Sequence, residues 1–306
     1  MEEDKGGFLT RLAALPHSYA GPDGVQPGPY ALEAFGEAKA MSGILSSWVD
    51  RGDVGRSTQF VLAGGLAGDN LEPLVEAAVS EGANVVVVGD AGDDANYVVP
   101  LDSLSLYSYF HYLGYATGHG AAVREVDDAM QLMCDRLRPE EPTDVNPAKM
   151  LAWTLWNRVP LLLTSRQSSA LQPLVQQVFA RVGKSLAIPA GDHPLLVVAG
   201  AFEGRHALGD DVVGLVLGEG DRELEVVGEM LETRIAQLEQ MDGDVLLGIR
   251  LQDRVANFML TWYLSLWVAA YLALLHHHDP GNDDLYLSAA GAVEGRMHPL
   301  RRSGDR

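Results

Sequence analysis

The chain has 306 residues, of which 47% are hydrophobic and 21% are charged, and it contains a single cysteine, Cys134. A domain takes roughly 100–200 residues, so this length predicts about two globular domains, and one cysteine excludes an intrachain disulfide or a cysteine-rich metal site. With 22 basic and 42 acidic side chains, the net charge is −20, which disfavours binding to nucleic acids and to anionic membranes.

Short apolar runs alternate with amphipathic segments through the first half of the chain, in the order of a βαβαβ series. Strands are predicted at 30–35, 59–63, 84–88 and 97–100, and helices at 39–49, 70–81, 103–118 and 124–137. Such alternation is typical of an α/β fold with a parallel sheet that is flanked by helices. The acidic, proline-rich stretch 139–143 is the expected linker, so we predict domains at 1–138 and 139–306.

The second half repeats this alternation. Strands are predicted at 160–164, 186–189, 211–217 and 244–249, and helices at 146–157, 168–182, 222–240 and 283–295. The apolar run 195–202 fits a helix or a strand equally well.

The segment Val255–Leu275 has 21 residues without a charged side chain and is long enough to span a bilayer. Its aromatic residues lie in the middle of the segment, whereas membrane helices concentrate them at their ends. We therefore predict a buried core helix and no membrane span. The acidic segment 1–7 lacks the apolar core of a signal peptide, so a cytoplasmic protein is expected.

Three segments resemble the bacterial and archaeal bifunctional phosphoglucose/phosphomannose isomerase family, whose two domains are sugar isomerase (SIS) domains. Gln59–Gly89 resembles the family's strand, phosphate loop, helix and second strand. Asn146-Pro147-Ala148-Lys149, followed by Val159-Pro160, resembles its "NPAK" helix and the next strand. Tyr271–Leu275, followed by Asp279-Pro280, resembles its "YLAL…DP" segment.

The resemblance implies two SIS-like α/β domains, each with a parallel sheet between helices, in a homodimer. It implies a sugar phosphate as the ligand and interconversion of fructose 6-phosphate with glucose 6-phosphate or mannose 6-phosphate. No cofactor and no metal are expected. We expect the ligand where the carboxyl ends of the parallel strands meet the cleft between the two domains.

The family's phosphate loop reads approximately S-x-S-G-x-T-x-E-T, and residues 65–73 correspond to it. The family's two serines are replaced by Gly65 and Ala67, its glycine is retained as Gly68, and Asp69 and Asn70 follow. The backbone N–H groups of such a loop can bind phosphate without hydroxyls. Alternatively, Asp69 or Asn70 serves only as a helix N-cap. Two further candidate substrate-binding residues lie at the end of the expected strand 160–164. Thr164 is its last residue, and Ser165 comes directly after it.

The family's catalytic glutamate has no counterpart, because the matching position is Ala180 or Arg181, and neither is an ordinary base. The family's lysine on the last helix corresponds to Ala290. His193, beside Asp192, corresponds to the ring-opening histidine and is our candidate catalytic acid. Glu203 is our candidate replacement base.

The run His276–His278 is expected to cap a helix, because adjacent imidazoles point about 100° apart and cannot all bind one metal.

Together, the resemblance and the candidate site residues predict a phosphosugar-binding SIS protein in which isomerase activity is retained, reduced or lost. The alternative is a non-catalytic sensor of sugar phosphates, or a structural or interaction protein on the same fold.

Overall fold

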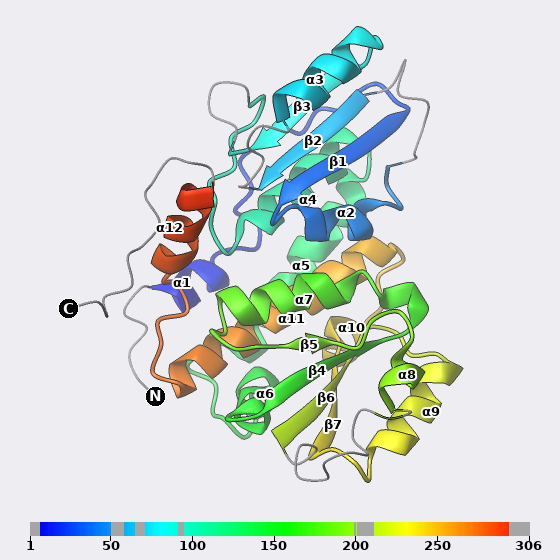
Figure 1. Cartoon of the computed structure of the whole chain (residues 1–306). Coiled ribbons are helices and arrows are strands. Elements are labelled where there is room, and N and C mark those ends of the chain that lie inside the picture. Colours follow the sequence, from blue (N-terminus) through cyan, green and yellow to red (C-terminus); the bar gives the residue numbers. More distant parts are fainter. Residues whose placement is uncertain are drawn as a thin grey trace, which may run out of the picture. The chain divides into compact units, whose positions relative to one another are not determined.

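The structure, a computed structural model, describes residues 7–49, 58–64, 71–90, 95–198, 200 and 211–293. Its contacts divide the chain into two compact units (Figure 1). The small unit comprises Tyr19–Gly120 and Asn282–Arg306, and the large unit comprises Met1–Ser18 and Ala121–Gly281. Each unit is thus assembled from two stretches of chain. The division of the chain into a domain 1–138 and a domain 139–306 stays a prediction.

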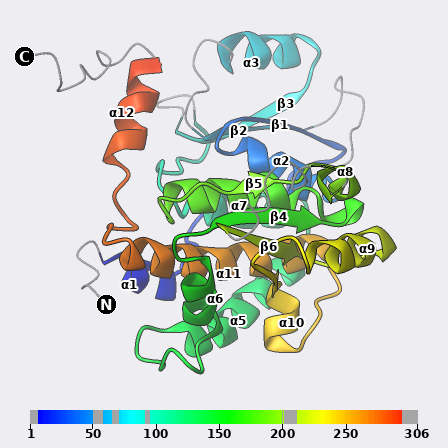
Figure 2. The same ribbon diagram turned by 60° about the horizontal axis from the view of Figure 1, so that its bottom comes forward.

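The small unit contains a parallel sheet in the order β1 (Tyr30–Gly36), β2 (Thr58–Gly64) and β3 (Asn84–Gly89). All seven residues of β2 are buried, because it is the central strand and helices cover both faces of the sheet. Figure 2 shows α2 (Lys39–Leu45) on one face and α3 (Leu71–Ser80) on the other. The sequence correctly predicted these three strands and placed both helices.

The aromatic helix α4 (Ser105–Ala116) is anchored to the end of the central strand, since the Tyr109 hydroxyl donates a hydrogen bond to the Ala63 carbonyl at 2.9 Å. The last helix of this unit is α12 (Asp284–Val293), and the Ser103 hydroxyl bonds the Asp283 carboxylate just before it. The strand predicted at 97–100 is wrong. Tyr97 forms only an isolated bridge with Val88. The Val87 N–H donates to the Asn96 side-chain oxygen, where a paired strand would offer a backbone carbonyl.

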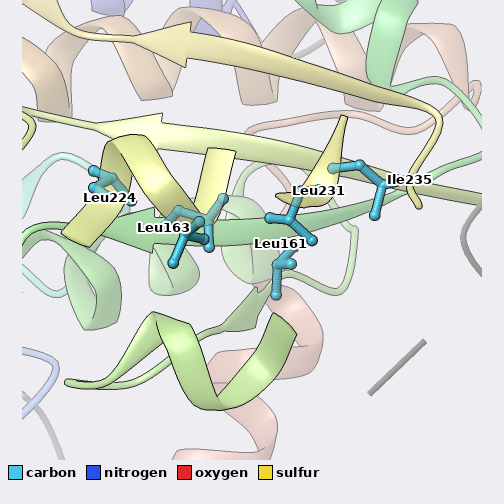
Figure 3. Close-up of a cluster of buried hydrophobic side chains, with 6 residues drawn as sticks. Leu161, Leu163, Leu224, Leu231 and Ile235 are labelled. Atoms are coloured by element: carbon cyan, nitrogen blue, oxygen red, sulfur yellow. The ribbon is translucent and has the colours of Figure 1, made fainter. Parts of the chain in front are cut away.

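The large unit contains a second parallel sheet in the order β5-β4-β6-β7. Its strands are β4 (Val159–Thr164), β5 (Ile188–Pro189), β6 (Val212–Leu217) and β7 (Gln237–Met241). Helices α8 (Pro194–Val198) and α9 (Arg222–Leu231) contact each other. A buried cluster joins α9 to this sheet, with Leu161 and Leu163 of β4 against Leu224 and Leu231 of α9 (Figure 3).

Helix α11 (Arg254–Leu275) forms the centre of the large unit's helical layer. It contacts α6 (Pro147–Leu155), α7 (Leu171–Arg181), α10 (Gly243–Leu247) and α1 (Phe8–Ala13). The large unit also contains helix α5 (Gly120–Leu137). In the most apolar 18-residue window of α11, 94% of the residues are buried inside the protein. This confirms the prediction that the segment is a buried core helix.

Two predictions near the end of the second sheet are wrong. The segment 222–240 is not one helix, because α9 ends at Leu231 and residues from Gln237 pair with β6 as strand β7. The expected strand 244–249 is helix α10. Asp242 decides this, since its carboxylate accepts the N–H of Asp244 and so caps a helix. The open segment 195–202 is helical as far as Val198.

Candidate functional site

The candidate phosphate loop lies in the small unit between the end of a strand and the start of a helix. Strand β2 ends at Gly64, and helix α3 begins at Leu71. A Cβ added to Gly64 would lie 2.4 Å from the Ala38 nitrogen, so the backbone at this strand end approaches its neighbour too closely for a side chain. The five predicted phosphate-binding residues of the loop lie outside the described residues: Gly65, Ala67, Gly68, Asp69 and Asn70.

The predicted residues Thr164 and Ser165 lie in the large unit at the carboxyl end of β4. Thr164 is 1% exposed, and its hydroxyl oxygen accepts a hydrogen bond from Gln172 Nε2 at 2.6 Å. Ser165 is also buried and donates to the Ser168 hydroxyl at 3.3 Å. Both hydroxyls are therefore already engaged within the protein, where they order the loop that follows β4.

Gln172 connects this strand end to the loop that follows β5. Its Nε2 donates to the Gly191 carbonyl at 3.0 Å, and its Oε1 accepts the Gly191 N–H at 2.9 Å. The structure thus brings Thr164 and the segment that leads to His193 to the same edge of the sheet. Sequence reasoning missed Gln172, because nothing in a helical glutamine signals that its amide will be buried.

Of the two predicted catalytic residues, the structure describes His193 but not Glu203. His193 is exposed and immediately precedes α8, and its carbonyl accepts the Leu196 N–H. Its neighbour Asp192 is also exposed. Glu203, the candidate base, lies outside the described residues.

The positions that correspond to the family's glutamate end helix α7. Ala180 is exposed, and Arg181 is half-buried in the last turn. A guanidinium does not deprotonate in proteins, so neither side chain can remove a proton from a sugar carbon. The described residues of the large unit therefore offer no carboxylate at this position of α7.

The Asn146–Lys149 motif has a structural role in the large unit. Asn146 caps α6 by accepting the Lys149 N–H, and its amide donates to the Arg138 carbonyl. The Lys149 side chain is buried; its Nζ donates to the Pro139 and Glu141 carbonyls, both at 2.6 Å, and lies 5.4 Å from the centre of the Tyr271 ring. Burial lowers the pKa of Lys149, while Glu140 and Glu141 oppose that shift.

The run His276–His278 lies at the end of α11, where the prediction of a capping segment placed it. The His276 N–H bonds the Leu272 and Ala273 carbonyls, and the His278 N–H also bonds Ala273. Burial, and then the two neighbouring imidazoles, lower the pKa of His276. Within the described ranges, no group of three or more histidine, cysteine, aspartate or glutamate residues has the geometry to bind a metal.

A cavity of about 700 Å³ lies at the carboxyl edge of the large unit's sheet. It is lined by the loop after β4, by the loop after β6 and by the residues that end β7. Because the connections after β4 and β6 lead to opposite ends of this sheet, the cavity lies at the point where open α/β sheets bind ligands. The polar residues that line it are Gln167, Ser168, Glu219, Gln240, Asp242, Asp244, Arg250, Gln252, Arg254, Asn257 and Thr261.

Asp244 is the most perturbed carboxyl group of this cavity. Burial raises its pKa to about 7, repulsion from Asp242 and Glu219 adds to the shift, and Arg250 opposes it. Its Oδ1 is buried and has no hydrogen-bond partner among the described residues. Sequence reasoning missed this group, because Asp244 was expected to begin a strand and because nothing placed it beside Glu219.

Two known domain families match the chain, one in each half. The family description "Phosphoglucose isomerase N-terminal domain" matches residues 8–118, and "Bacterial phospho-glucose isomerase C-terminal SIS domain" matches residues 144–285. Among curated proteins, no sequence matches the chain.

Solved structures match over most of their length. A glucose-6-phosphate isomerase like protein from Thermus thermophilus is 33% identical; the match covers 94% of this chain and 95% of that one, with a TM-score of 0.78. Glucosamine-6-phosphate deaminase from Thermotoga maritima is 9% identical, with coverage of 90% and 94% and a TM-score of 0.55.

The C-terminal domain of glucosamine-fructose-6-phosphate aminotransferase from Francisella tularensis is 10% identical, with coverage of 90% and 95% and a TM-score of 0.52. The likeness to the deaminase and the aminotransferase concerns the fold alone. The 33% identity along 94% of the chain, together with the matches to both domains, shows more than a fold. The chain belongs to the family of bacterial phosphoglucose isomerase-like proteins with SIS domains.

Proposed function

We propose that the chain binds a sugar phosphate through the segment that connects β2 to α3 in the small unit. We further propose that its capacity to interconvert fructose 6-phosphate with glucose 6-phosphate or mannose 6-phosphate is reduced or lost. The observation that carries the binding proposal is the order strand, loop, helix at this point, since β2 ends at Gly64 and α3 begins at Leu71. The N-terminus of a helix after a buried strand favours a bound anion.

The chemistry of the described residues supports the second part of the proposal. An aldose–ketose isomerase needs a positioned base that moves a proton between C1 and C2 of the open sugar. Ala180 and Arg181 at the end of α7 cannot supply that base. His193 remains a candidate acid for ring opening, since it is exposed at the sheet edge. A protein with these residues would bind the sugar phosphate and turn it over slowly or not at all.

This chemistry also favours a second function, that of a non-catalytic sensor of sugar phosphates. Such a sensor would bind the ligand and leave it unchanged. A purely structural or interaction protein would do neither. We extend the proposal to a cytoplasmic homodimer, whose oligomeric state is tested by sedimentation equilibrium.

Binding and turnover are tested in separate experiments on the full chain. Isothermal titration calorimetry compares glucose 6-phosphate and fructose 6-phosphate with glucose, and binding of the phosphorylated sugars alone supports the proposal. Deuterium incorporation from heavy water into fructose 6-phosphate is followed by NMR, with a protein-free blank. Incorporation at a fast rate would show that another base works, and Glu203→Gln and His193→Ala would then locate the acid and the base.

A matched pair of variants tests the location of the site. Asn70→Asp adds a negative charge to the candidate loop and is expected to weaken binding of sugar phosphates at least tenfold. Asn84→Asp makes the same change at the amino end of β3, the opposite end of the sheet, and is expected to leave binding unchanged. Equal effects of the two variants, or no binding by the parent protein, would refute the proposal.

A further inference from the structure

The cavity of the large unit has a volume of about 700 Å³. Ligand pockets of roughly 300–1,000 Å³ bury most of a small organic molecule. The cavity differs in chemistry from a phosphate site, because three carboxyl groups line it: Glu219, Asp242 and Asp244. A dianionic phosphate would meet repulsion from those of these groups that are ionised and unpaired.

The two arginines of the cavity cancel only part of this negative charge, since they face three carboxyl groups. Arg250 Nη2 lies 2.7 Å from Glu219 Oε2, so these two charges neutralise each other. Arg254 donates to the Gln167 side-chain oxygen at 2.9 Å, and its guanidinium lies 5.8 Å from the centre of the Phe258 ring. Arg254 is therefore bonded to a neutral amide and, among the residues that the structure describes, to no carboxylate.

The two aspartates have different environments although they are two residues apart. Asp242 Oδ1 accepts the N–H of Asp244 at 2.8 Å and of Val245 at 3.4 Å, so its carboxylate is engaged in the cap of α10. Asp244 makes no ion pair in the described part of the chain. The residue is half-buried and lines the cavity, and its Oδ1 is shielded from solvent without a hydrogen-bond partner, so the carboxyl group is partly desolvated. A carboxyl group that is desolvated in this way gains a favourable partner when a cation binds beside it.

We propose that this cavity binds a small polyhydroxylated amine, with Asp244 as the carboxylate that receives the ammonium group. The amide side chains of Gln240 and Asn257 and the hydroxyl of Thr261 line the same cavity and provide the kind of donors and acceptors that hydroxyl groups need. The site lies within the large unit, whereas the sugar-phosphate site is proposed for a loop of the small unit.

The ionisation of Asp244 couples this binding to pH. The charged groups that face it are Asp242 at the end of β7, Glu219 after β6, and Arg250 after α10, with Arg254 of α11 also lining the cavity. Burial holds the pKa of Asp244 at about 7, so the free protein is mostly protonated there at pH 6 and mostly ionised at pH 8. An ammonium ion binds only the ionised form, so affinity should rise by close to tenfold over this interval.

Calorimetry on the full chain tests the proposal with two open-chain hexitols that differ in one group. Glucamine carries a primary amine that stays protonated between pH 6 and 8, and glucitol carries a hydroxyl in its place. Glucamine is expected to bind at least tenfold more tightly than glucitol at pH 8. Titrations near pH 7 in two buffers of different ionisation enthalpy should show that a proton is released on binding.

Two variants assign the effect to Asp244. Asp244→Asn should weaken glucamine binding at least tenfold and remove both the proton release and the pH dependence. Glu223→Gln, which removes an exposed carboxylate of α9 that does not line the cavity, should change none of these quantities. Thermal unfolding of each variant shows whether it is folded.

The opposite results would overturn the proposal. These are no binding of glucamine by the parent protein, equal affinity for glucitol, or unchanged glucamine binding by folded Asp244→Asn. The sugar-phosphate proposal can fail independently, because Asn70→Asp should leave glucamine binding intact. If Asn70→Asp and Asp244→Asn both abolished binding of both ligands, the two sites would not be separate.

Discussion

The side-chain amide of Gln172 forms two hydrogen bonds with the backbone of Gly191, one through each of its polar atoms, at 3.0 and 2.9 Å. Its Nε2 also bonds the Thr164 hydroxyl at 2.6 Å. One buried side chain therefore holds together the ends of two adjacent parallel strands, β4 and β5. The loop that leads to His193 depends on this amide for its position.

Replacement of Gln172 by leucine should be strongly destabilising. Leucine has a similar size but leaves the buried Thr164 hydroxyl without its donor and removes both hydrogen bonds to Gly191. An unsatisfied buried polar group costs about 1–3 kcal/mol. We expect the free energy of unfolding to fall by about 2–4 kcal/mol, measured by urea denaturation. Gln177→Leu on the same helix is the control and should cost far less. Equal stability of the two variants would contradict this role.

Lys149 should stabilise the large unit through its two carbonyl partners and not through a surface ion pair. Lys149→Met keeps most of the side chain's volume but leaves the Pro139 and Glu141 carbonyls without a donor. We expect a loss of about 1–3 kcal/mol in urea denaturation. Lys39→Met, at an exposed position of α2, should change stability very little. A Lys149→Met protein as stable as the parent would show that the buried ammonium contributes nothing net.

Asp244 should make the protein less stable as the pH rises. Its pKa in the folded protein is about 7, above the ordinary value of 3.8, so the folded state binds more protons than the unfolded state between these values. The stabilising contribution of the neutral carboxyl is complete below pH 4 and is lost as the pH rises through 7.

The variant Asp244→Asn isolates that contribution. The difference in Tm between this variant and the parent should grow in favour of the variant from pH 5 to pH 8, because asparagine stays neutral. Thermal unfolding at several pH values measures it, and Glu223→Gln should run parallel to the parent. A constant difference across this range would show that the pKa of Asp244 is not raised.

Gly89 should tolerate no side chain at the end of β3. Its φ is +134°, and an added Cβ would lie 2.1 Å from the Ala63 carbonyl oxygen. Gly118 also has a positive φ, of +83°, but nothing lies within 4 Å of its Cβ position. We expect Gly89→Ala to cost more than about 3 kcal/mol and Gly118→Ala about 1 kcal/mol, by urea denaturation. Similar costs would mean that backbone strain, and not the close contact, dominates.

Parts of the site could be expected from the sequence and others could not. The apolar run 160–164 correctly placed Thr164 and Ser165 at a strand end, since a short apolar run marks a parallel strand. The fate of their hydroxyls depends on Gln172 and Ser168, which approach them only in the folded chain. Asp244 was missed for the same reason: its pKa follows first from burial, which only the folded chain produces, then from the charge of Asp242 and, to a smaller extent, from Glu219 in a different loop of the chain.

The sequence by itself determined the class of fold, the family and the burial of α11, because apolar periodicity and ordered motifs are properties of local stretches of chain. It misjudged the region after α9, where the amphipathic pattern of 222–240 conceals a turn and strand β7. Only the tertiary structure decided that Lys149 is a buried structural cation and that a cavity with a poorly solvated carboxyl lies beside β6 and β7. These features arise from solvent exclusion and from contacts between distant residues, which no local pattern encodes.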